Sequence, residues 1–94
     1  MSTYSKDQIR EGLKKLQGWS VAGKAIQRQF TFPSFTAAIQ FVNKIAELAE
    51  KNNHHPDITI HYKKVILSLT THEFSGLTER DFNLAQQIDQ REAL

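Results

Sequence analysis

The amino-acid sequence predicts an α+β domain in which a four-stranded antiparallel sheet carries three helices on one face. The chain has 94 residues, enough for one hydrophobic core but not for two. Apolar residues recur at intervals of three and four in some segments and of two in others, as in helices and half-buried strands. These segments follow the order helix, strand, strand, helix, strand, strand, helix, which favours hairpins covered by a helical layer. We therefore expect residues 1–94 to form one domain.

The first helix is predicted over residues 6–16. Ser5 followed by Gln8 is a capping-box pattern, in which each side chain binds the backbone of the other at a helix start. Apolar residues then recur at helical spacing, at Ile9, Leu13 and Leu16.

A hairpin is predicted next. A short strand over residues 19–21 and a longer one over residues 26–32 flank a turn at residues 23–24. In the longer strand one set of alternating residues is mostly apolar, and this period of two indicates a half-buried strand. That set is Ile26, Arg28, Phe30 and Phe32, and the opposite set is Gln27, Gln29 and Thr31.

The longest helical pattern begins after Pro33 and Ser34, where Ser34 is a candidate N-cap, and ends at residues 52–53. Its apolar residues form one stripe, which we expect to lie across the sheet. The stripe consists of Phe35, Ala38, Ile39, Val42, Ile45, Ala46 and Ala49.

A second hairpin and a last helix complete the predicted fold. Strands are expected over residues 58–62 and 65–70, with a tight turn at residues 63–64 and with Tyr62 in the core. After Gly76, Thr78 followed by Asp81 is a second capping box, which predicts a helix over residues 79–90.

The composition excludes several classes of protein. The net charge is +2 and the basic residues are spread along the chain, so we do not expect direct nucleic-acid binding. Without cysteine there is no disulfide and no thiolate zinc site, and no apolar run is long enough for a membrane span. We expect a cytoplasmic protein. Its small core and exposed sheet edges favour a homodimer or homotetramer.

Histidines mark the candidate site. His54 and His55 follow the long helix, and His72 follows the fourth predicted strand. The start of one hairpin strand lies beside the end of the other, so these three side chains should meet at one end of the sheet. Glu50 and Asp81 are expected in the same neighbourhood. Imidazoles titrate near neutral pH, so such a cluster suits general acid and base chemistry.

Each of these residues also has a structural interpretation. His54 and His55 could be cations that the dipole favours at a helix C-terminus. Asp81 fits a capping box, and Glu50 could be a solvated helix residue. His61 lies on the strand face of Thr59 and is interpreted as a surface residue.

A zinc site is a further alternative, because His54, His55, His72 and a carboxylate could fill its coordination positions. Adjacent side chains in extended backbone diverge, however, and rarely aim at one ion. We therefore do not expect a metal site.

The spacing of these residues resembles the signature of the pterin-4a-carbinolamine dehydratases. The elements are an acidic residue, three positions, His-His-Pro, an aromatic residue, a further His, and an Asp after a glycine turn. They stand here as Glu50, His54-His55-Pro56, Tyr62, Thr71-His72-Glu73 and Gly76-Leu77-Thr78-Glu79-Arg80-Asp81. The element order and length match as well, so the resemblance covers nearly the whole chain as one such domain.

The resemblance implies an enzyme, a 4a-hydroxytetrahydrobiopterin dehydratase, that removes water from 4a-hydroxy-tetrahydropterin and gives quinonoid dihydropterin. It also implies that the reaction needs neither a metal nor an organic cofactor. This lyase reaction recycles the pterin of aromatic amino acid hydroxylases, which makes a hydroxylase a possible pathway partner. His54 and His72 are implied as the proton-transfer pair and His55 as chiefly a substrate binder. Glu50 and Asp81 would orient the imidazoles.

Asn53 and Thr71 are expected to contact the substrate beside the histidines. Asn53 also departs from some family members, which have an acidic residue there, as Ile58 departs from an aromatic residue. Animal relatives also serve as a dimerisation cofactor of a homeodomain transcription factor. The alternative function is therefore a dimerisation or coactivator-type interaction module.

Overall fold

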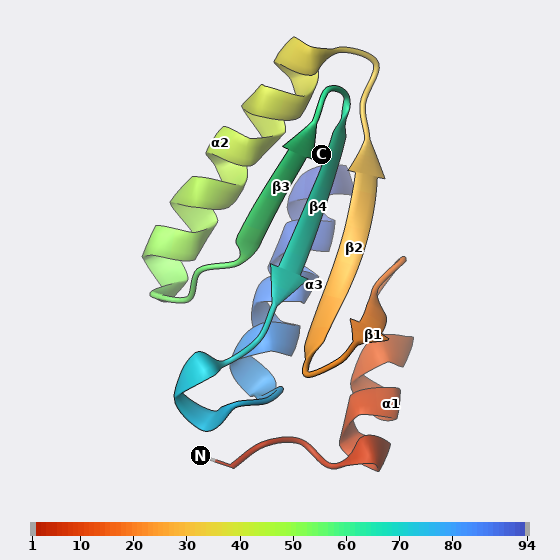
Figure 1. The fold of residues 1–94 in the computed structure, drawn as a ribbon, viewed down its shortest axis with the longest axis vertical. Coiled ribbons are helices and arrows are strands. Elements are labelled where there is room, and N and C mark those ends of the chain that lie inside the picture. The colour runs from red at the N-terminus through yellow and green to blue at the C-terminus, as the bar shows by residue number, and fades with distance from the viewer. Residues whose placement is uncertain (1, 94) are drawn as a thin grey trace.

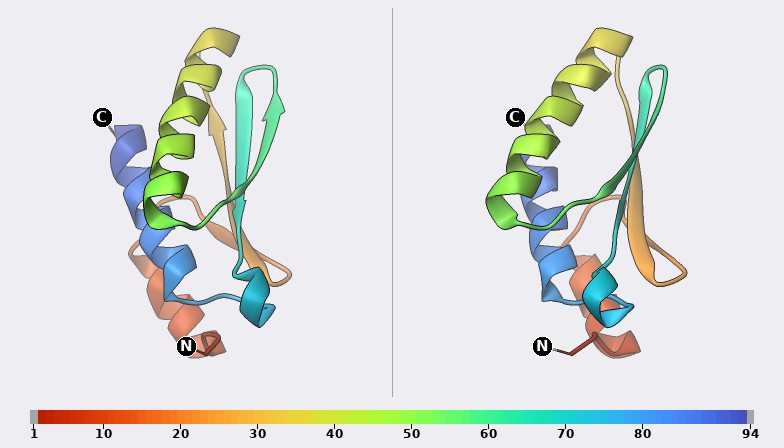
Figure 2. Two further views of the ribbon diagram at one scale, coloured as in Figure 1. Left: turned by 90° about the vertical axis from the view of Figure 1, so that its left-hand side faces the viewer. Right: turned by 60° about the vertical axis from the view of Figure 1, so that its left-hand side comes forward.

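The computed structural model describes residues 2–93 and contains the predicted order of elements. They are α1 (Lys6–Lys14), β1 (Ser20–Ala22), β2 (Ala25–Thr31), α2 (Phe35–Asn52), β3 (Asp57–His61), β4 (Lys64–Leu69), the 3₁₀ helix η1 (His72–Phe74) and α3 (Glu79–Ala93). The four strands form one antiparallel sheet in the order β1-β2-β4-β3 (Figure 1). The helices lie on one face of this sheet, so the predicted fold class is confirmed (Figure 2).

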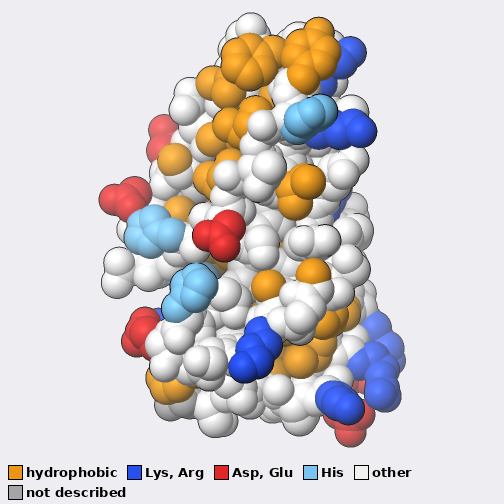
Figure 3. Space-filling view, viewed as in Figure 1, with side chains coloured by type: hydrophobic (Ala, Val, Ile, Leu, Met, Phe, Trp, Pro, Cys, Tyr) orange, Lys and Arg blue, Asp and Glu red, His pale blue; other side chains and the backbone are white. Residues whose placement is uncertain are grey.

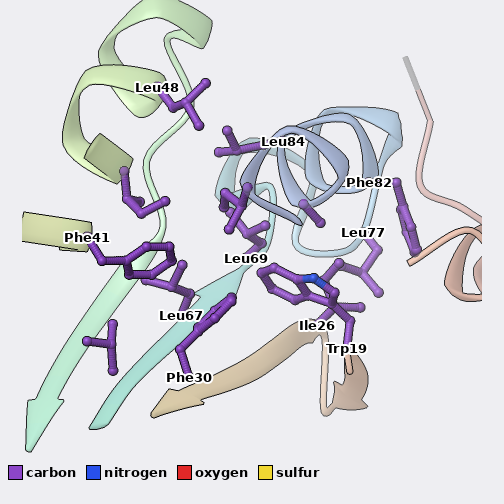
Figure 4. Close-up of a cluster of buried hydrophobic side chains, with 14 of the residues drawn as sticks. Trp19, Ile26, Phe30, Phe41, Leu48, Leu67, Leu69, Leu77, Phe82 and Leu84 are labelled. Atoms are coloured by element: carbon purple, nitrogen blue, oxygen red, sulfur yellow. The ribbon is translucent and has the colours of Figure 1, made fainter. Parts of the chain in front are cut away.

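The core fills the space between the sheet and its helices (Figure 4). Alternate residues of β4, Val65, Leu67 and Leu69, are completely buried, whereas Ile66 and Ser68 between them are half-buried. This period of two is the one that the sequence predicts. Aromatic side chains complete the layer, with the Phe30 and Phe41 rings 4.8 Å apart.

The first two helices begin at the capping residues that the sequence predicts. Ser5 and Gln8 form the complete capping box of α1, and the Ser34 hydroxyl accepts the Ala37 N–H at the start of α2. α1 ends at Lys14 and not at residue 16, because the next two N–H groups bond three residues back, as in a 3₁₀ turn. β1 is displaced by one residue from its prediction, and α3 runs three residues further.

The buried face of α2 is rotated from the predicted stripe. Phe35 is 50% exposed and Ala46 is exposed, so these two stripe residues do not enter the core. Phe41 and Leu48, outside the predicted stripe, are buried instead. Contacts with β4 and α3 select this face, since the helix presents apolar residues on more than half of its circumference.

The turn between β3 and β4 differs from the prediction. His61 pairs with Lys64, so the turn residues are Tyr62 and Lys63, one position earlier than expected. Tyr62 has a positive φ of 55° and is 65% exposed, and the expectation that it belongs to the core is wrong. β3 is an edge strand, and Ile58 and Ile60 remain 37% and 40% exposed.

Within residues 2–93, no helix combines the length and the apolar character that crossing a membrane requires.

Candidate active site

Four segments meet at one end of the sheet. Asp57 at the start of β3 pairs with Ser68 near the end of β4, so the loop that precedes β3 lies beside the segment that follows β4 (Figure 1). The C-terminus of α2 feeds the first of these segments. The second continues through η1 to the N-terminus of α3.

The end of α2 is shaped by Asn53. Its backbone is left-handed, with φ 50°, and its N–H contacts the carbonyls of Ala49 and Glu50. The His54 N–H also donates to the Ala49 carbonyl, at 3.1 Å. This is the pattern in which a left-handed residue closes a helix, and asparagine adopts it more readily than most residues. The chain therefore turns abruptly away from α2 at the two histidines.

His72 is presented by a closed loop. Thr71 and Gly76 form an isolated antiparallel bridge, with N···O distances of 3.0 and 3.4 Å. Between them η1 makes a tight turn that ends at Ser75 in left-handed conformation. The loop holds His72 at the surface next to the end of β4.

A depression of about 180 Å³ lies where these segments meet. It is open to solvent, and histidine and acidic side chains adjoin one another on the surface viewed in Figure 3. The residues that line it are Asn53, His54, His55, Thr70, Thr71, His72 and Glu73. Its size is below the roughly 300 Å³ at which pockets for drug-sized ligands begin, so it suits one small ring system.

His54 is the most enclosed of the three imidazoles. Its side chain is 10% exposed, and its Nε2 lies 2.6 Å from Oδ1 of Asp81, which is completely buried. The second carboxylate oxygen, Oδ2, accepts the Thr78 N–H at 3.0 Å and the Thr71 hydroxyl at 2.9 Å. Asp81 therefore caps α3 with one oxygen and contacts His54 with the other.

His55 lies in a different environment. Its Nε2 is 2.5 Å from Oε2 of Glu50, and the two side chains are 58% and 77% exposed. His72 is exposed in the loop beside them. The next residue, Glu73, accepts a hydrogen bond from Arg80 at 3.1 Å.

The structure brings the residues of the predicted constellation together. Five of the seven line one depression, namely the three histidines, Asn53 and Thr71. The other two, Glu50 and Asp81, each contact a histidine. Their chemical roles remain predictions. His61 is at the opposite end of β3, beside the turn, and is exposed as expected.

Three further residues of this region were not predicted as site residues from the sequence. Glu73 and Thr70 line the depression, and the Thr78 hydroxyl contacts the Thr71 hydroxyl at 2.8 Å beneath it. Glu73 follows His72 directly, which is a usable signal. The capping box already accounts for a threonine at position 78, so nothing in the sequence indicates its contact with Thr71.

Nitrogen atoms of the adjacent histidines point to different carboxylates. Nε2 of His54 contacts Asp81, whereas Nε2 of His55 contacts Glu50. In the described part of the chain, no three His, Asp or Glu side chains are grouped as ligands of one metal ion.

This chain is similar to known proteins over nearly its whole length. The family model described as "Pterin 4 alpha carbinolamine dehydratase" matches residues 2–91. A protein of Roseiflexus sp. is 52% identical over 91 residues, which are 96% of this chain and 98% of the relative. One of Sulfurisphaera tokodaii is 44% identical over 90 residues, with coverage of 96% and 97%. Both relatives carry the name "Putative pterin-4-alpha-carbinolamine dehydratase".

Two solved structures are also similar to this chain. A "transcriptional coactivator/pterin dehydratase" from Brucella melitensis superposes with a TM-score of 0.91 at 33% identity, over 95% of this chain and 97% of that one. A pterin dehydratase-like protein, described as a RuBisCO assembly factor in the alpha-carboxysome, has a TM-score of 0.63 at 20% identity. The match covers 77% of this chain and 83% of that protein's chain, and at this identity it shows a shared fold alone.

Proposed function

The chain belongs to the pterin 4 alpha carbinolamine dehydratase family, and from this premise we propose that it dehydrates a 4a-hydroxy-tetrahydropterin by histidine acid and base catalysis. The family and the names of the relatives support pterin dehydratase activity. The observation that carries the catalytic part of the proposal is the grouping of three imidazoles around one small depression.

The reaction needs two proton transfers. The C4a–O bond breaks and its electron pair leaves with oxygen, which must take up a proton to depart as water. A ring N–H loses its proton, and that electron pair forms the new C=N bond of the quinonoid dihydropterin. One acid and one base, placed at different edges of the ring, are therefore sufficient. Neither step requires a metal or an organic cofactor.

His54 and His72 are the proposed proton-transfer pair. They come from different segments, the end of α2 and the loop after β4, and line the same depression. A ring bound there can be addressed from two sides. Asp81 supports His54 from the buried side, because its carboxylate is fixed by hydrogen bonds to Thr71 and Thr78.

His55 is assigned to substrate binding. Its ring is more exposed than that of His54, and Glu50 contacts it at the surface. Asn53 and Thr71 line the depression and are assigned to contact with the substrate.

The test is the decay of chemically generated 4a-hydroxy-tetrahydropterin in a stopped-flow spectrometer, with and without the protein. We expect catalytic amounts of protein to accelerate the formation of quinonoid dihydropterin. An unchanged decay rate at substrate concentrations up to the millimolar range would overturn the proposed activity. Coupling to an aromatic amino acid hydroxylase would then test whether the reaction recycles that enzyme's pterin.

A second candidate function is a protein-interaction module, which the name of the Brucella melitensis protein, "transcriptional coactivator/pterin dehydratase", favours. The two functions separate experimentally, because an interaction module needs its surface and not its imidazoles. Replacing His54 and His72 together would bring dehydration close to the spontaneous rate and leave binding of a protein partner intact.

Self-association through the β3 edge is also proposed. In an antiparallel pair centred on Thr59, Ile58 would lie opposite the partner's Ile60, and Asp57 would lie opposite the partner's His61. The strand is thus complementary to itself in apolar contacts and in the polar pair of Asp57 and His61, as a two-fold interface requires. On the face of the molecule that Figure 3 shows, apolar side chains gather over the β3–β4 hairpin and the start of α2.

A further inference from the structure

Two threonine hydroxyl groups are buried beneath the depression, beside the carboxylate of Asp81. Thr71 is 1% exposed and Thr78 is completely buried, like Asp81. Their hydroxyls lie 2.8 Å apart, and every buried side-chain N or O atom of the described chain has a hydrogen-bond partner. Each proton in this cluster must therefore point at an acceptor, because an unpaired buried polar group is costly.

The contacts fix the direction of these hydrogen bonds. The Arg80 N–H, which can only donate, contacts the Thr78 hydroxyl oxygen at 3.3 Å. The hydroxyl proton of Thr78 then has one remaining neighbour, the Thr71 oxygen, which accepts it. The single hydroxyl proton of Thr71 is thereby directed to Oδ2 of Asp81, at 2.9 Å.

Oδ2 of Asp81 consequently receives two donors, the Thr71 hydroxyl and the Thr78 N–H. A carboxylate that is satisfied by donors on one oxygen offers its other oxygen as an acceptor. That oxygen, Oδ1, faces Nε2 of His54 at 2.6 Å. This arrangement favours Nε2 of the imidazole as the donor in this short contact.

We infer that Thr71 and Thr78 are positioning residues that act through Asp81 to keep the proton of His54 on Nε2. The other ring nitrogen, Nδ1, is then the atom of His54 that exchanges a proton with the substrate. The kinetic part of this inference rests on the proposed function, whereas the tautomer of His54 does not.

The tautomer can be observed directly by NMR on the full chain labelled with ¹⁵N-histidine. Two-bond ¹H–¹⁵N correlations distinguish a protonated from an unprotonated ring nitrogen, and His54→Ala identifies the His54 signals. At a pH at which the same spectra show the ring of His54 to be neutral, we expect its proton on Nε2 alone. A proton on Nδ1 of the neutral ring would overturn the inference.

Asp81→Asn gives a sharper test. Thr71 and Thr78 both require an acceptor, so the amide oxygen should occupy the Oδ2 position and the NH₂ group should face His54. His54 must then accept at Nε2 and carry its proton on Nδ1. We expect inversion of the tautomer and a loss of roughly 10²- to 10⁴-fold in kcat, as for an asparagine that imposes the wrong tautomer on a catalytic histidine.

Adding Thr71→Val to Asp81→Asn isolates the part played by the threonine. Without the Thr71 donor the amide is less firmly oriented, and we expect the inverted His54 signal to divide between two tautomers. An inversion as complete as in Asp81→Asn alone would show that Thr71 does not position the group, and would contradict the inference.

Kinetics of the single variants complete the test. Thr71→Val and Thr78→Val should each lower kcat by about tenfold, the effect of one lost hydrogen bond, with KM within about twofold. Thr71→Ser should restore the rate. Thr31→Val, an exposed substitution at the far end of β2, is the matched control and should change neither parameter.

Failure of this inference and of the proposed function can be told apart. If the protein has no dehydratase activity but the His54 tautomer inverts in Asp81→Asn, the hydrogen-bond network stands and the proposed function fails. If activity is present and Thr71→Val and Thr78→Val both keep the parental kcat, the positioning role fails and the dehydratase remains.

Discussion

His54 and His55 are neighbours in the chain but are held in different ways. His54 is nearly enclosed and contacts a buried carboxylate, whereas His55 and Glu50 form a pair on the surface. An exposed pair of this kind contributes about 0–1 kcal/mol and orients its members weakly. A proton-transfer group needs fixed geometry more than a binding group does, and this difference motivates unequal roles for the two histidines.

Replacing single histidines should separate rate from binding. We expect His54→Ala or His72→Ala to lower kcat by roughly 10²- to 10⁴-fold with a smaller change in KM, as for loss of a positioned acid or base. His55→Ala should raise KM and leave kcat within a few-fold. The measurement is the initial rate of dehydration over a range of pterin concentrations.

The control for this series is His61→Ala, at the opposite end of β3. It should change neither parameter by more than about twofold. The assigned site is wrong if His61→Ala is as damaging as His72→Ala, or if all three variants of the site keep the parental kcat. If His54 and His55 merely exchange effects, the site stands and the roles within it are reversed.

Chelation should leave the rate unchanged. Adjacent imidazoles that point to different carboxylates do not present two ligands to one ion, and the proposed steps are proton transfers only. The check is the dehydration rate after extended dialysis against a chelator, with the metal content measured in parallel. Stoichiometric zinc, together with activity that is lost on chelation and restored by the metal, would replace the acid and base account by a Lewis-acid one.

The sequence predicts which residues meet at the site but not how they pair. Spacing and hairpin geometry bring His54 and His72 to one end of the sheet. The contact of Asp81 with His54 depends on how α3 packs against the end of α2, and a pattern already explained by a capping box gives no hint of it. The prediction that Tyr62 belongs to the core is wrong for a related reason. The alternation of apolar residues continues into the turn, whereas the pairing of His61 with Lys64 ends the strand.

Among the elements, α3 is tied to the sheet by one carboxylate near its C-terminus. Asp89 accepts hydrogen bonds from the Trp19 indole at 2.7 Å, from Arg28 at 2.6 Å and from the Gln17 N–H at 3.0 Å. Arg28 and Asp89 are only 15% and 12% exposed. This group joins the loop before β1, strand β2 and α3 at the end of the helix away from Asp81.

Asp89→Asn should destabilise the fold without removing activity. It leaves a nearly buried arginine without its closest carboxylate, which costs about 2–4 kcal/mol of unfolding free energy. Asp89 lies eight positions further along the helix than Asp81, a rise of about 12 Å, so we expect kcat to stay within about twofold. Urea unfolding followed by Trp19 fluorescence measures the loss.

The matched control is Glu92→Gln. Glu92 contacts the same arginine at 3.7 Å, but its side chain is 36% exposed, so its loss should cost under about 1 kcal/mol. Equal stability of the two variants would contradict the role assigned to Asp89.

Elements were predictable where the determining interaction is local. The caps at Ser5 and Ser34 are read from adjacent residues, and the structure contains both. The buried face of α2 was not predictable in detail, because its sequence offers several apolar faces and the packing of β4 and α3 selects one. The position of the β3–β4 turn likewise depends on strand register, which the residues of the turn do not determine here.

At the scale of the whole molecule, the sheet has two edges of different character. β1 has three residues, which is short for pairing with another chain, whereas β3 has five and carries exposed isoleucines. A very short edge strand offers few backbone groups for pairing with another chain, whereas a longer apolar edge strand tends to be paired. This asymmetry supports self-association through β3.

We expect the protein to be a dimer or a larger oligomer at micromolar concentration, and Ile60→Lys to shift it towards the 10.8 kDa monomer. The matched control is Val21→Lys on β1, where the parent residue is 47% exposed compared with 40% for Ile60. Light scattering coupled to size exclusion reads out the mass. A parent protein that is monomeric under these conditions, or a Val21→Lys variant that dissociates as Ile60→Lys does, would count against the β3 interface.

The central claim is that the imidazoles around one depression dehydrate a hydroxypterin. The most direct measurement compares the stopped-flow decay of 4a-hydroxy-tetrahydropterin with the parent protein and with a His54→Ala, His72→Ala double variant, both verified as folded by circular dichroism. We predict rapid decay with the parent and decay within about tenfold of the spontaneous rate with the double variant, since the two groups act on one step. Equal acceleration by both proteins, or by neither, would contradict the account.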